Sequence, residues 1–595
     1  MHGDGYWNFI TVDTYNDLVH IWEGEEGVKT YTADFETTTN LEDCRVWAFA
    51  VCDVDDPSSV WYGNDIEGFF ELLKVLPNCK VYFHNLAFDV SFIFDYMLKN
   101  GYAWENDRFP RYDNGFTAFI SDMNQIYSVR INFGRGHTVT IWDSLKIIPL
   151  SIRSEAKAFG LDEGKGELDY TAYREVGHVL TDEERDYIRR DVQIDAKALR
   201  IMFDNGSTSM TIGACALKDY KDMMGGTRGF RYHFPVLEPE QDKFIRMAYK
   251  GGFVYVNPKY AGKELGEGIS FDVNSLYPSV MASCAGEQLP YGKPVWFYGE
   301  YETDNKYPLW IAQVTCTFKI REGRIPCIQM KGNLSFLPTE YITDSKGEVV
   351  ITVTSVDWNL IQQQYEVEVI KWHGGYKFRQ STELFKKYVS KWVEVKNKAT
   401  VEGNTGLRTI AKLYLNSLYG KFATQLEVRS RKPIIEEGVL RYVDIPSYER
   451  EGVYLPVGCF ITAWARYKTI TTAQSCGDRF IYSDTDSVKV LGVRPMDIDV
   501  DPVRLGAWKD EGHFTRFKAL RAKTYIADYS RDLNKKLEVH VAGLPLNCHR
   551  QVTFENFRGG ARYKGKLYQK RVDGGIVLVE GDFEIKGENA NGKGI

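Results

Sequence analysis

The sequence lacks the patterns that place a chain in a membrane or in an oxidising compartment. Nowhere in its 595 residues do 18 consecutive apolar residues occur, and Asp4 stands where a signal peptide carries positive charge. Its ten cysteines are scattered without a C-x-x-C pair, which argues against zinc and disulfide frameworks. We therefore expect a protein of a reducing cytoplasm that has no membrane contact.

The chain also lacks an excess of positive charge, since its formal net charge is -7 at pH 7. This balance argues only weakly against a nucleic-acid protein, because phosphates are bound by local basic surfaces rather than by total charge. Hydrophobic residues make up 44% of the chain and aromatic residues 14%. Such a content is sufficient for the cores of several globular domains.

The sequence YSDTDS at residues 482–487 stands between apolar residues and predicts a tight hairpin. Asp484 and Asp486 repel each other on such a rigid element unless a cation offsets their charge. A calcium loop is excluded, because its sixth position would be Lys489 rather than glycine and its twelfth Pro495 rather than glutamate. A solvated turn is the alternative for this motif alone. A metal site here requires a third, remote carboxylate.

The motif FDVNSLYP supplies this carboxylate as Asp272, at the end of an expected strand. A third motif lies in residues 408–422, which predict a helix with Lys412, Asn416 and Tyr419 on one face. A solvated basic face is the alternative. Together with two metal carboxylates, however, a cationic and aromatic face suits the phosphates and the base of a nucleoside triphosphate.

A second acidic group lies in the first third of the chain. Asp34 and Glu36 alternate along an expected strand and share one face, although an exposed strand would look the same. Asp89 follows another apolar strand. The sequence TDEE then predicts a capping box that opens a helix in which Tyr187 and Asp191 share a face. This set suits two metal ions and a tyrosine that orients an attacking water.

The motifs DFE, FHNLAFD and Y-x-x-x-D resemble Exo I, Exo II and Exo III of proofreading 3′-5′ exonucleases of the DEDD type with tyrosine. By this resemblance Asp34, Glu36 and Asp191 bind metal with Asp89 beside them, Tyr187 positions the water, and Lys165 adds positive charge near the transition state. For Phe88 and for Phe92, a plain role in the apolar core is the alternative. The residues implied to hold a frayed 3′ end are Tyr82, His84, Asn85, Phe88, Phe92, Ser144 and Leu145.

FDVNSLYP, KLYLNSLYG and YSDTDS, in this order, resemble motifs A, B and C of family B DNA polymerases, and Lys523-Thr524-Tyr525 resembles their KxY motif. The resemblance covers essentially the whole chain. YKGGF at residues 249–253 and the compact length resemble the protein-primed polymerases of small tailed Bacillus phages. Family members often have arginine where Lys250 stands, which places the balance between synthesis and editing in question. If the source is a virus, the implied location is the cytoplasm of its host.

The resemblance implies two Mg²⁺ ions per active site, with Mn²⁺ as an alternative, held by Asp272, Val273 and Asp484, while Asp486 lies beside them. Tyr277 would exclude a 2′-hydroxyl, and Tyr419 would pack against the nascent base pair. The implied nucleotide-binding residues are Val273, Tyr277, Lys396, Arg408, Lys412, Asn416 and Tyr419. The implied DNA contacts of this half are Tyr249, Gly251, Gly252, Ser275, Thr462, Arg466, Lys523 and Tyr525.

The implied fold is α/β (α+β multidomain), with a ribonuclease H-like exonuclease domain and a right-hand polymerase of palm, fingers and thumb. The implied partners of a monomer are primer-template DNA, deoxynucleoside triphosphates and a terminal priming protein. The expected divisions are exonuclease 1–211, palm 212–283 and 451–555, fingers 384–423, thumb and tail 556–595, and insertions 284–383 and 424–450, which resemble terminal-protein regions 1 and 2.

Three other functions are less compatible with the sequence. A repair exonuclease whose second half only binds DNA would lack a polymerase carboxylate, yet both Asp272 and Asp484 are present. A non-catalytic replication scaffold has no reason to keep charged positions that repel one another. A reverse transcriptase would more commonly show two adjacent aspartates where this chain has Asp-Thr-Asp.

Overall fold

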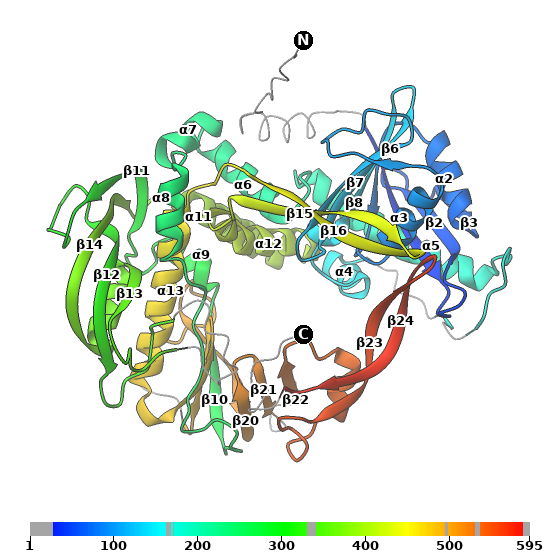
Figure 1. Cartoon of the computed structure of the whole chain (residues 1–595). Coiled ribbons are helices and arrows are strands. Elements are labelled where there is room, and N and C mark those ends of the chain that lie inside the picture. Colours follow the sequence, from blue (N-terminus) through cyan, green and yellow to red (C-terminus); the bar gives the residue numbers. More distant parts are fainter. Residues whose placement is uncertain are drawn as a thin grey trace, which may run out of the picture.

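The computed structural model describes residues 28–161, 168–169, 172–329, 341–493, 498–529 and 536–586. The elements follow one another around a ring, and a C-terminal hairpin returns to the N-terminal sheet (Figure 1). No helix in these ranges is long and apolar enough to cross a membrane. The predicted Lys165 lies outside the described residues.

A mixed sheet carries the first acidic group. β1 (Lys29–Thr37) pairs in parallel with β4 (Cys79–Phe83), which pairs in parallel with β8 (His137–Asp143), and antiparallel with β2 (Val46–Asp53). The order of the sheet is β16-β15-β6-β7-β8-β4-β1-β2-β3, with β5 paired to β6. Its other strands are β3 (Val60–Gly63), β5 (Ala103–Trp104), β6 (Gly115–Ser121), β7 (Ile126–Gly134), β15 (Glu427–Glu436) and β16 (Val439–Glu449).

Helices cover both faces of this sheet, so the predicted α/β class is confirmed. α2 (Ile66–Val75) and α3 (Val90–Lys99) share one apolar core with the sheet. α4 (Ile152–Phe159) and α5 (Asp182–Asp204) pack on the other face. The predicted capping box is present at the start of α5, where Thr181 accepts from a backbone amide and Glu184 closes the reciprocal bond.

The alternation of β1 directs its acidic residues toward α5. Phe35 belongs to the core beneath α2 and α3, whereas the Thr32 hydroxyl, on the opposite face, donates to the Val192 carbonyl oxygen of α5 at 2.7 Å. Because side chains alternate along a strand, Asp34 and Glu36 lie on the same face as Thr32. The acidic pair therefore faces the helix that carries the third acid of the group.

The predicted insertion 424–450 forms the hairpin of β15 and β16 and extends the N-terminal sheet. β15 pairs with β6 through Ser430 opposite Ser121 and Arg431 opposite Ile120. The Arg431 guanidinium also donates to the Asn124 side chain at 2.9 Å. A segment that stands 300 residues later in the chain thus becomes part of the first sheet.

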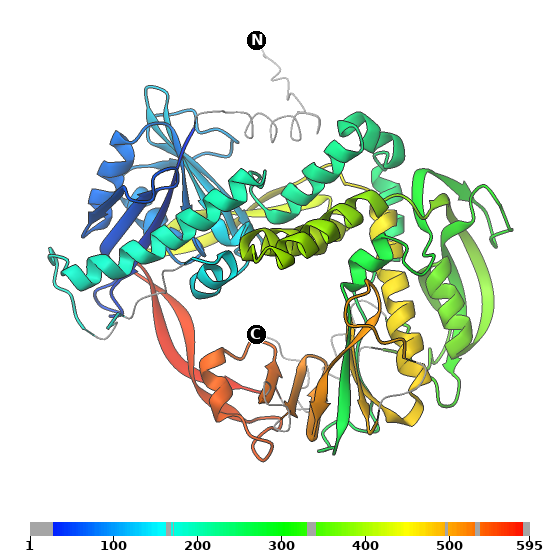
Figure 2. The same cartoon turned by 180° about the vertical axis from the view of Figure 1, so that it is seen from behind.

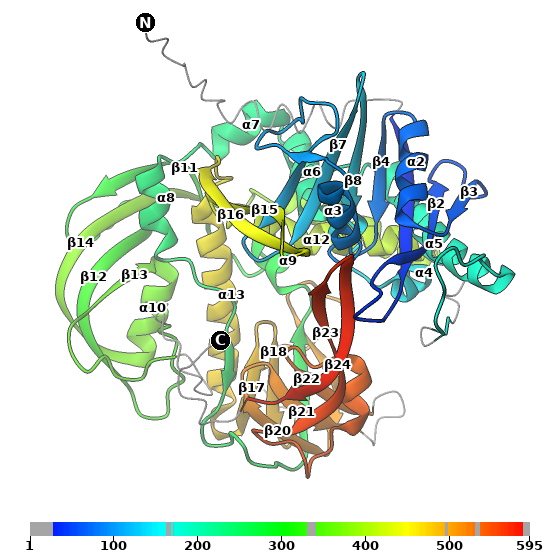
Figure 3. The same cartoon turned by 45° about the vertical axis from the view of Figure 1, so that its right-hand side comes forward.

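A five-stranded antiparallel sheet carries the second acidic group. Its spatial order is β19 (Trp508–Phe514), β10 (Gly268–Val273), β18 (Ser487–Leu491), β17 (Phe480–Asp484) and β9 (Val254–Val256). The long helix α13 (Leu455–Ser475) lies between this sheet and the insertion that follows α9 (Leu276–Met281), as Figures 1 and 3 show.

The insertion 284–383 is a subdomain with its own core. Its four strands, in the order β11-β14-β12-β13, curve around one helix (Figure 3). They are β11 (Leu289–Phe297), β12 (Leu309–Ile320), β13 (Val349–Thr354) and β14 (Tyr365–Ser381), with the helix α10 (Ser355–Gln364). Trp310, Phe318 and Trp358 are among the residues of its separate apolar cluster.

Helices connect the two sheets. α11 (Lys386–Val401) and α12 (Thr405–Phe422) pack together in the segment predicted to form the fingers, and the helix predicted over residues 408–422 is confirmed as part of α12. The helices that precede β9 are α6 (Ile212–Met223), α7 (Gly226–His233) and α8 (Pro239–Arg246).

The C-terminal part contains β20 (Arg516–Arg521), β21 (Thr524–Asp528), β22 (Leu537–Val541) and a hairpin of β23 (Arg562–Val572) and β24 (Gly575–Glu584). One apolar cluster joins the hairpin to residues 541–557. The predicted thumb of residues 556–595 therefore shares its core with the segment before it. The predicted tail at 587–595 lies outside the described residues.

The tip of the β23–β24 hairpin contacts the N-terminal sheet, as the view from behind shows (Figure 2). Asp573 forms an ion pair with Lys99 of α3 and a backbone bridge with Val439 of β16. Gly574 lies so close to the Cys44 carbonyl oxygen that an added Cβ would stand 2.1 Å from it. The hairpin thereby closes the ring of elements.

We predict that Gly574→Ala releases this tip, because its Cβ would collide with a backbone oxygen that cannot move aside. The matched control is Gly560→Ala, whose φ of +79° resembles the +89° of Gly574 but whose Cβ would meet nothing within 4 Å. Hydrogen exchange should rise roughly tenfold or more over residues 572–577 in the first variant only. Equal protection of this segment in both variants would contradict the contact.

Candidate active sites

The carboxylates of motifs A and C lie in one cross-strand row of the five-stranded sheet. Asp272 of β10 stands opposite Ser487 of β18, and Ser487 stands opposite Asp484 of β17, which confirms the predicted hairpin. Residues that share a row project from the same face. Two strand spacings, roughly 10 Å between Cα atoms, separate the two aspartates. The Val273 amide donates to the Asp486 carbonyl oxygen at 2.8 Å, which brings the third aspartate to this row.

The electrostatics of this row favour a divalent cation. Burial and then the nearby Asp486 raise the pKa of Asp272 to about 7, and burial raises the pKa of Asp486. Asp484 instead has a cationic partner, since Lys523 Nζ lies 2.8 and 2.9 Å from its two oxygens. A set of carboxylates and a backbone carbonyl offers only oxygen donors, which are the ligands that Mg²⁺ prefers. These residues fit the ions that the resemblance implies.

The YKGGF segment lies directly against the motif C turn. The Thr485 amide donates to the Phe253 carbonyl oxygen at 2.6 Å, and the Thr469 hydroxyl of α13 donates to the Thr485 carbonyl oxygen at 2.8 Å. A Cβ added to Gly252 would stand 2.7 Å from Thr485 Cγ2. Thr485 itself has a φ of +58°, so this turn is strained and is held by its neighbours. Glycine at position 252 permits the close approach.

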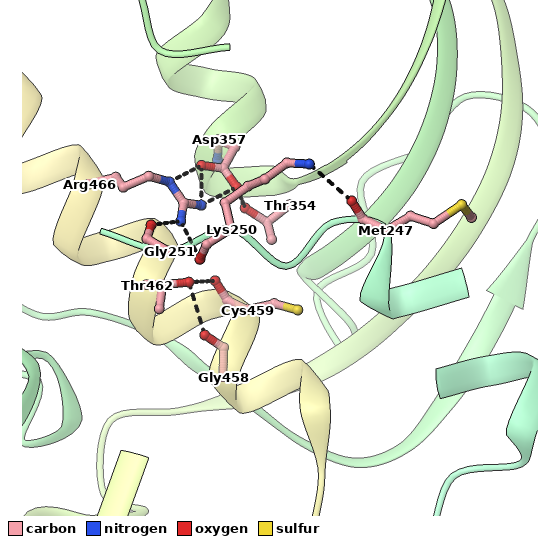
Figure 4. A network of polar contacts seen from close by, with 9 residues as sticks. All are labelled: Met247, Lys250, Gly251, Thr354, Asp357, Gly458, Cys459, Thr462 and Arg466. Carbon is pink, nitrogen blue, oxygen red and sulfur yellow. Dashed lines mark hydrogen bonds and ion pairs between the residues drawn. The ribbon is translucent and has the colours of Figure 1, made fainter. Parts of the chain in front are cut away.

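Arg466 holds the same segment from the other side (Figure 4). Its Nη1 donates to the carbonyl oxygens of Lys250 at 2.9 Å and of Gly251 at 2.8 Å. Its Nη2 donates to both carboxylate oxygens of Asp357, at 2.7 and 2.9 Å. Asp357 stands in the first turn of α10, where its amide is bound by the Thr354 hydroxyl. One guanidinium therefore links the insertion, the palm helix α13 and the loop.

Two predicted DNA contacts are corrected by this network. Arg466 is 4% exposed and Thr462 is 1% exposed, and the Thr462 hydroxyl donates within its own helix to the Gly458 and Cys459 carbonyl oxygens. In this structure both residues contact protein rather than offering a surface to DNA. Arg466 binds the carbonyl oxygen of Gly251, so the YKGGF segment, rather than Arg466 itself, is the part that can approach a DNA strand.

α12 brings Tyr419, one of the predicted nucleotide-binding residues, against Tyr277 of motif A. The rings of Tyr277 and Tyr419 stack with centroids 4.0 Å apart. Burial, followed by Arg408 and Lys412, lowers the pKa of Lys396, so these three cations from α11 and α12 lie near one another. Such a cationic group is what a triphosphate requires. Asn416 is exposed on the same helix.

Three other predicted DNA contacts of the polymerase half, Tyr525, Tyr249 and Ser275, lie in different surroundings. Tyr525 is 7% exposed: its hydroxyl donates to Glu538 at 2.6 Å, and Lys489 Nζ lies 4.9 Å from the centre of its ring. Tyr249 is half-buried, and burial raises its pKa. Ser275 begins α9 with a φ of +53°, in the turn that follows Asp272.

The exonuclease group assembles at the ends of β1, β4 and α5. Burial, then Asp34 and then Glu36, raise the pKa of Asp89, which shows that these carboxylates lie close together. Asp191 is buried on α5, beside the residue that Thr32 of β1 binds, and Tyr187 is buried one turn before it. Four carboxylates with oxygen donors alone fit two Mg²⁺ ions as well.

The residues predicted to hold a 3′ end lie at the ends of two neighbouring strands. Asp143, which sequence reasoning missed, accepts from the amides of Asn85 and Leu145, each at 3.0 Å. His84 Nδ1 lies 3.0 Å from the Ser144 hydroxyl. A carboxylate that ends a strand just before Ser144-Leu145 was the available signal for Asp143. No sequence signal pointed to Asp357, because it stands in the insertion, outside every motif.

Two aromatic residues of this group are corrected. Tyr82 is 1% exposed and packs against Trp142 and Phe203, so it supports the sheet rather than offering a ring to a base. Phe92 is 2% exposed and lies under Gly575 at the hairpin tip. Phe88 is half-buried with its ring 5.7 Å from that of Phe92, and it remains available.

Comparisons with known proteins agree with this geometry. The family described as "DNA polymerase type B, organellar and viral" matches residues 76–181 and 173–498. The DNA polymerase of Bacillus phage phi29 is 42% identical over 94% of this chain and 99% of its own length, and that of Streptococcus phage Cp-1 is 32% identical over 93% and 98%.

A solved structure of the phi29 polymerase complexed with primer-template DNA and incoming nucleotide substrates matches with a TM-score of 0.88 at 40% identity, over 94% of this chain and all of that one. The chain therefore belongs to the type B DNA polymerases, and it is a phage-type DNA polymerase with an exonuclease domain. More particularly, it is similar throughout its fold to the phi29-type Bacillus phage enzymes.

We predict that Gly252→Ala lowers polymerisation about 10- to 100-fold, because the new Cβ would displace Thr485 between the two motif C aspartates. The matched control is Gly251→Ala, whose Cβ would meet nothing within 4 Å and whose carbonyl still accepts from Arg466. The measurement is primer extension with Mg²⁺. Equal loss in the two variants would mean that the contact with Thr485 does not set the geometry of motif C.

We also predict that metal-free protein loses stability as the pH rises from about 4 to about 7. The folded state holds the Asp272 proton, since its pKa is raised to about 7, whereas the unfolded chain releases it near pH 4. The loss is on the order of 2 kcal/mol once screening by solvent is allowed for. It is measured as the difference between urea unfolding of the wild type and of Asp272→Asn in EDTA, which should vanish below pH 4.

Proposed function

We propose that this polymerase extends primer strands on a DNA template with deoxynucleoside triphosphates and removes mispaired 3′ ends at its second acidic site. The observation that carries the proposal is the row of Asp272 and Asp484, together with the stacking of Tyr277, in the helix that follows Asp272, on Tyr419 of α12. Primer-template DNA and incoming nucleotides are named for the complexes of the phi29 polymerase, which supports the same partners here.

Asp272, the Val273 carbonyl and Asp484 would hold two Mg²⁺ ions, and Asp34, Glu36, Asp89 and Asp191 would hold those of the exonuclease site. When bound, such ions lower the pKa of the attacking hydroxyl and neutralise the leaving phosphate. The chain's own groups do the rest. Lys396, Arg408 and Lys412 neutralise the triphosphate, and the Tyr277 ring leaves no room for a 2′-hydroxyl. In the exonuclease site Tyr187 orients the water.

In this proposal Lys523 pairs with Asp484 and also contacts the primer strand. Its Nζ lies 2.8 and 2.9 Å from the two carboxylate oxygens of Asp484. The Lys523 side chain is 52% exposed, so it can turn toward the phosphate of a primer terminus when a metal ion takes its place on Asp484. The ion pair thus orients the Asp484 carboxylate within the motif C turn.

The two insertions support protein priming and strand displacement. The β15–β16 hairpin joins the exonuclease sheet, and the β23–β24 tip bridges to it through Val439 and Asp573. This closed connection suits a collar that retains DNA and separates the downstream strand. The separate core of residues 284–383 suits a docking platform for a priming protein.

The two activities should be separable by substitution. Asp484→Asn is expected to lower synthesis at least about 1,000-fold by removing one metal ligand, while 3′-5′ degradation continues. Asp34→Ala with Glu36→Ala should remove degradation and leave synthesis, so each variant is the control of the other. The measurement uses a primed single-stranded circle with Mg²⁺, all four deoxynucleotides and no helicase.

On this circle, wild-type products many times the length of the template would establish strand displacement. Products that stop after one circuit would contradict the collar while leaving polymerisation intact. Loss of both activities in Asp484→Asn would contradict two separate sites.

A further inference from the structure

A third cluster of metal-binding side chains lies behind the exonuclease site. It consists of His84, which follows β4, Glu155 of α4 and Asp195 of α5. Their ligand atoms all lie within 4.8 Å of one another. His84 Nδ1 is 3.7 Å from Glu155 Oε2 and 3.9 Å from Asp195 Oδ1. None of the functions derived above uses Glu155 or Asp195.

The two carboxyl groups are buried with few polar neighbours, namely each other, His84 and the Ser144 hydroxyl beside Asp195. Glu155 is 0% exposed and Asp195 is 2% exposed. Both oxygens of Glu155 and Oδ1 of Asp195 have no hydrogen-bond partner in the described part of the chain. Leaving such atoms unsatisfied costs several kcal/mol in a folded protein, and two adjacent carboxylates add their mutual repulsion. The cluster is therefore one that a cation would complete.

The histidine is oriented as a metal ligand. Its Nε2 lies 2.7 Å from the Leu150 carbonyl oxygen, which can only accept, so Nε2 carries the proton. In the neutral imidazole the lone pair is then on Nδ1, the atom that faces both carboxylates. A backbone carbonyl on the far nitrogen is the usual second partner of a metal-bound histidine. The Ser144 hydroxyl, 3.0 Å from Nδ1, supplies a further oxygen nearby.

We propose that His84, Glu155 and Asp195 form a structural site for Zn²⁺. One imidazole and two carboxylates are a ligand set that zinc accepts at about 2.0–2.2 Å from each donor, with water or the Ser144 hydroxyl as a fourth ligand. Two negative charges balance the ion, so no net charge is buried. The neighbouring set of Asp34, Glu36, Asp89 and Asp191 has oxygen donors alone and suits Mg²⁺ instead.

Zinc here would tie three elements of the exonuclease domain together. α4 and α5 would be joined to the segment after β4, and His84 and Ser144 would be fixed at the place where the 3′ end is proposed to lie. The proposal does not depend on how the polymerase site works. Its readout is metal content rather than catalysis.

The test uses the full-length protein, stripped with EDTA and equilibrated with micromolar Zn²⁺ in a large excess of Mg²⁺, which occupies the catalytic carboxylates. After dialysis, elemental mass spectrometry should find one retained zinc per chain. The double variant Glu155→Gln with Asp195→Asn keeps the shapes of both side chains and should retain at least tenfold less. The matched control, Asp34→Ala with Glu36→Ala, should retain the full equivalent.

A second variant and a second readout guard against misfolding. His84→Ala removes a half-buried side chain and should also lose the zinc. Zinc should raise the melting temperature of the wild type and of the Asp34→Ala, Glu36→Ala control by several degrees, and that of the two site variants not at all. Folding is checked by circular dichroism in EDTA.

Three outcomes would overturn the proposal. In the first, folded wild-type protein retains no zinc, which would mean that shared protons close the cluster. In the second, the Glu155→Gln, Asp195→Asn protein retains as much zinc as the wild type. In the third, the Asp34→Ala, Glu36→Ala control loses the ion, which would place it in the catalytic set.

Discussion

The polymerase half depends on a single buried guanidinium. Arg466 projects from α13 and binds Asp357 of the insertion on one side and two carbonyl oxygens of the YKGGF segment on the other. Such a buried charge is stable only while its partners remain, and removing one partner typically costs about 3–5 kcal/mol. The segment that it holds contacts Thr485, which stands between the two motif C aspartates. The geometry of the motif C carboxylates is thus linked to an insertion far from them in the sequence.

Both active sites solve the same electrostatic problem by the same means. Carboxylates that repel one another are fixed on strands and helices whose cores lie elsewhere, so the repulsion cannot be relieved by movement. In the exonuclease site β1 is fixed to α5 by the Thr32 hydroxyl, and in the polymerase site β10 is fixed to the hairpin of β17 and β18. The raised pKa values of Asp89 and Asp272 reflect the cost of ionising a buried carboxyl group beside other carboxylates.

Local sequence patterns predicted the elements well. The polar turn of YSDTDS, the capping box at Thr181 and the periodic helix through Lys412 and Tyr419 all stand where their residues indicated. Each of these signals operates within a few residues, because turns, caps and helix faces are determined by neighbours along the chain. The predicted acids were found in the same way, since each stands in a short motif on or just after a strand, or, for Asp191, on the helix that the capping box opens.

Other features depended on contacts that no local pattern contains. Tyr82 and Phe92 stand in a motif that suggests DNA, yet one is enclosed by the sheet core and the other by the tip of a hairpin from the opposite end of the chain. Arg466 and Thr462 are buried because α13 lies between two sheets. The sequence by itself determined the chemistry, namely which carboxylates, cations and aromatic rings are available and on which elements. Only the tertiary structure decided which of them meet and which reach solvent, because burial and pairing arise between segments hundreds of residues apart.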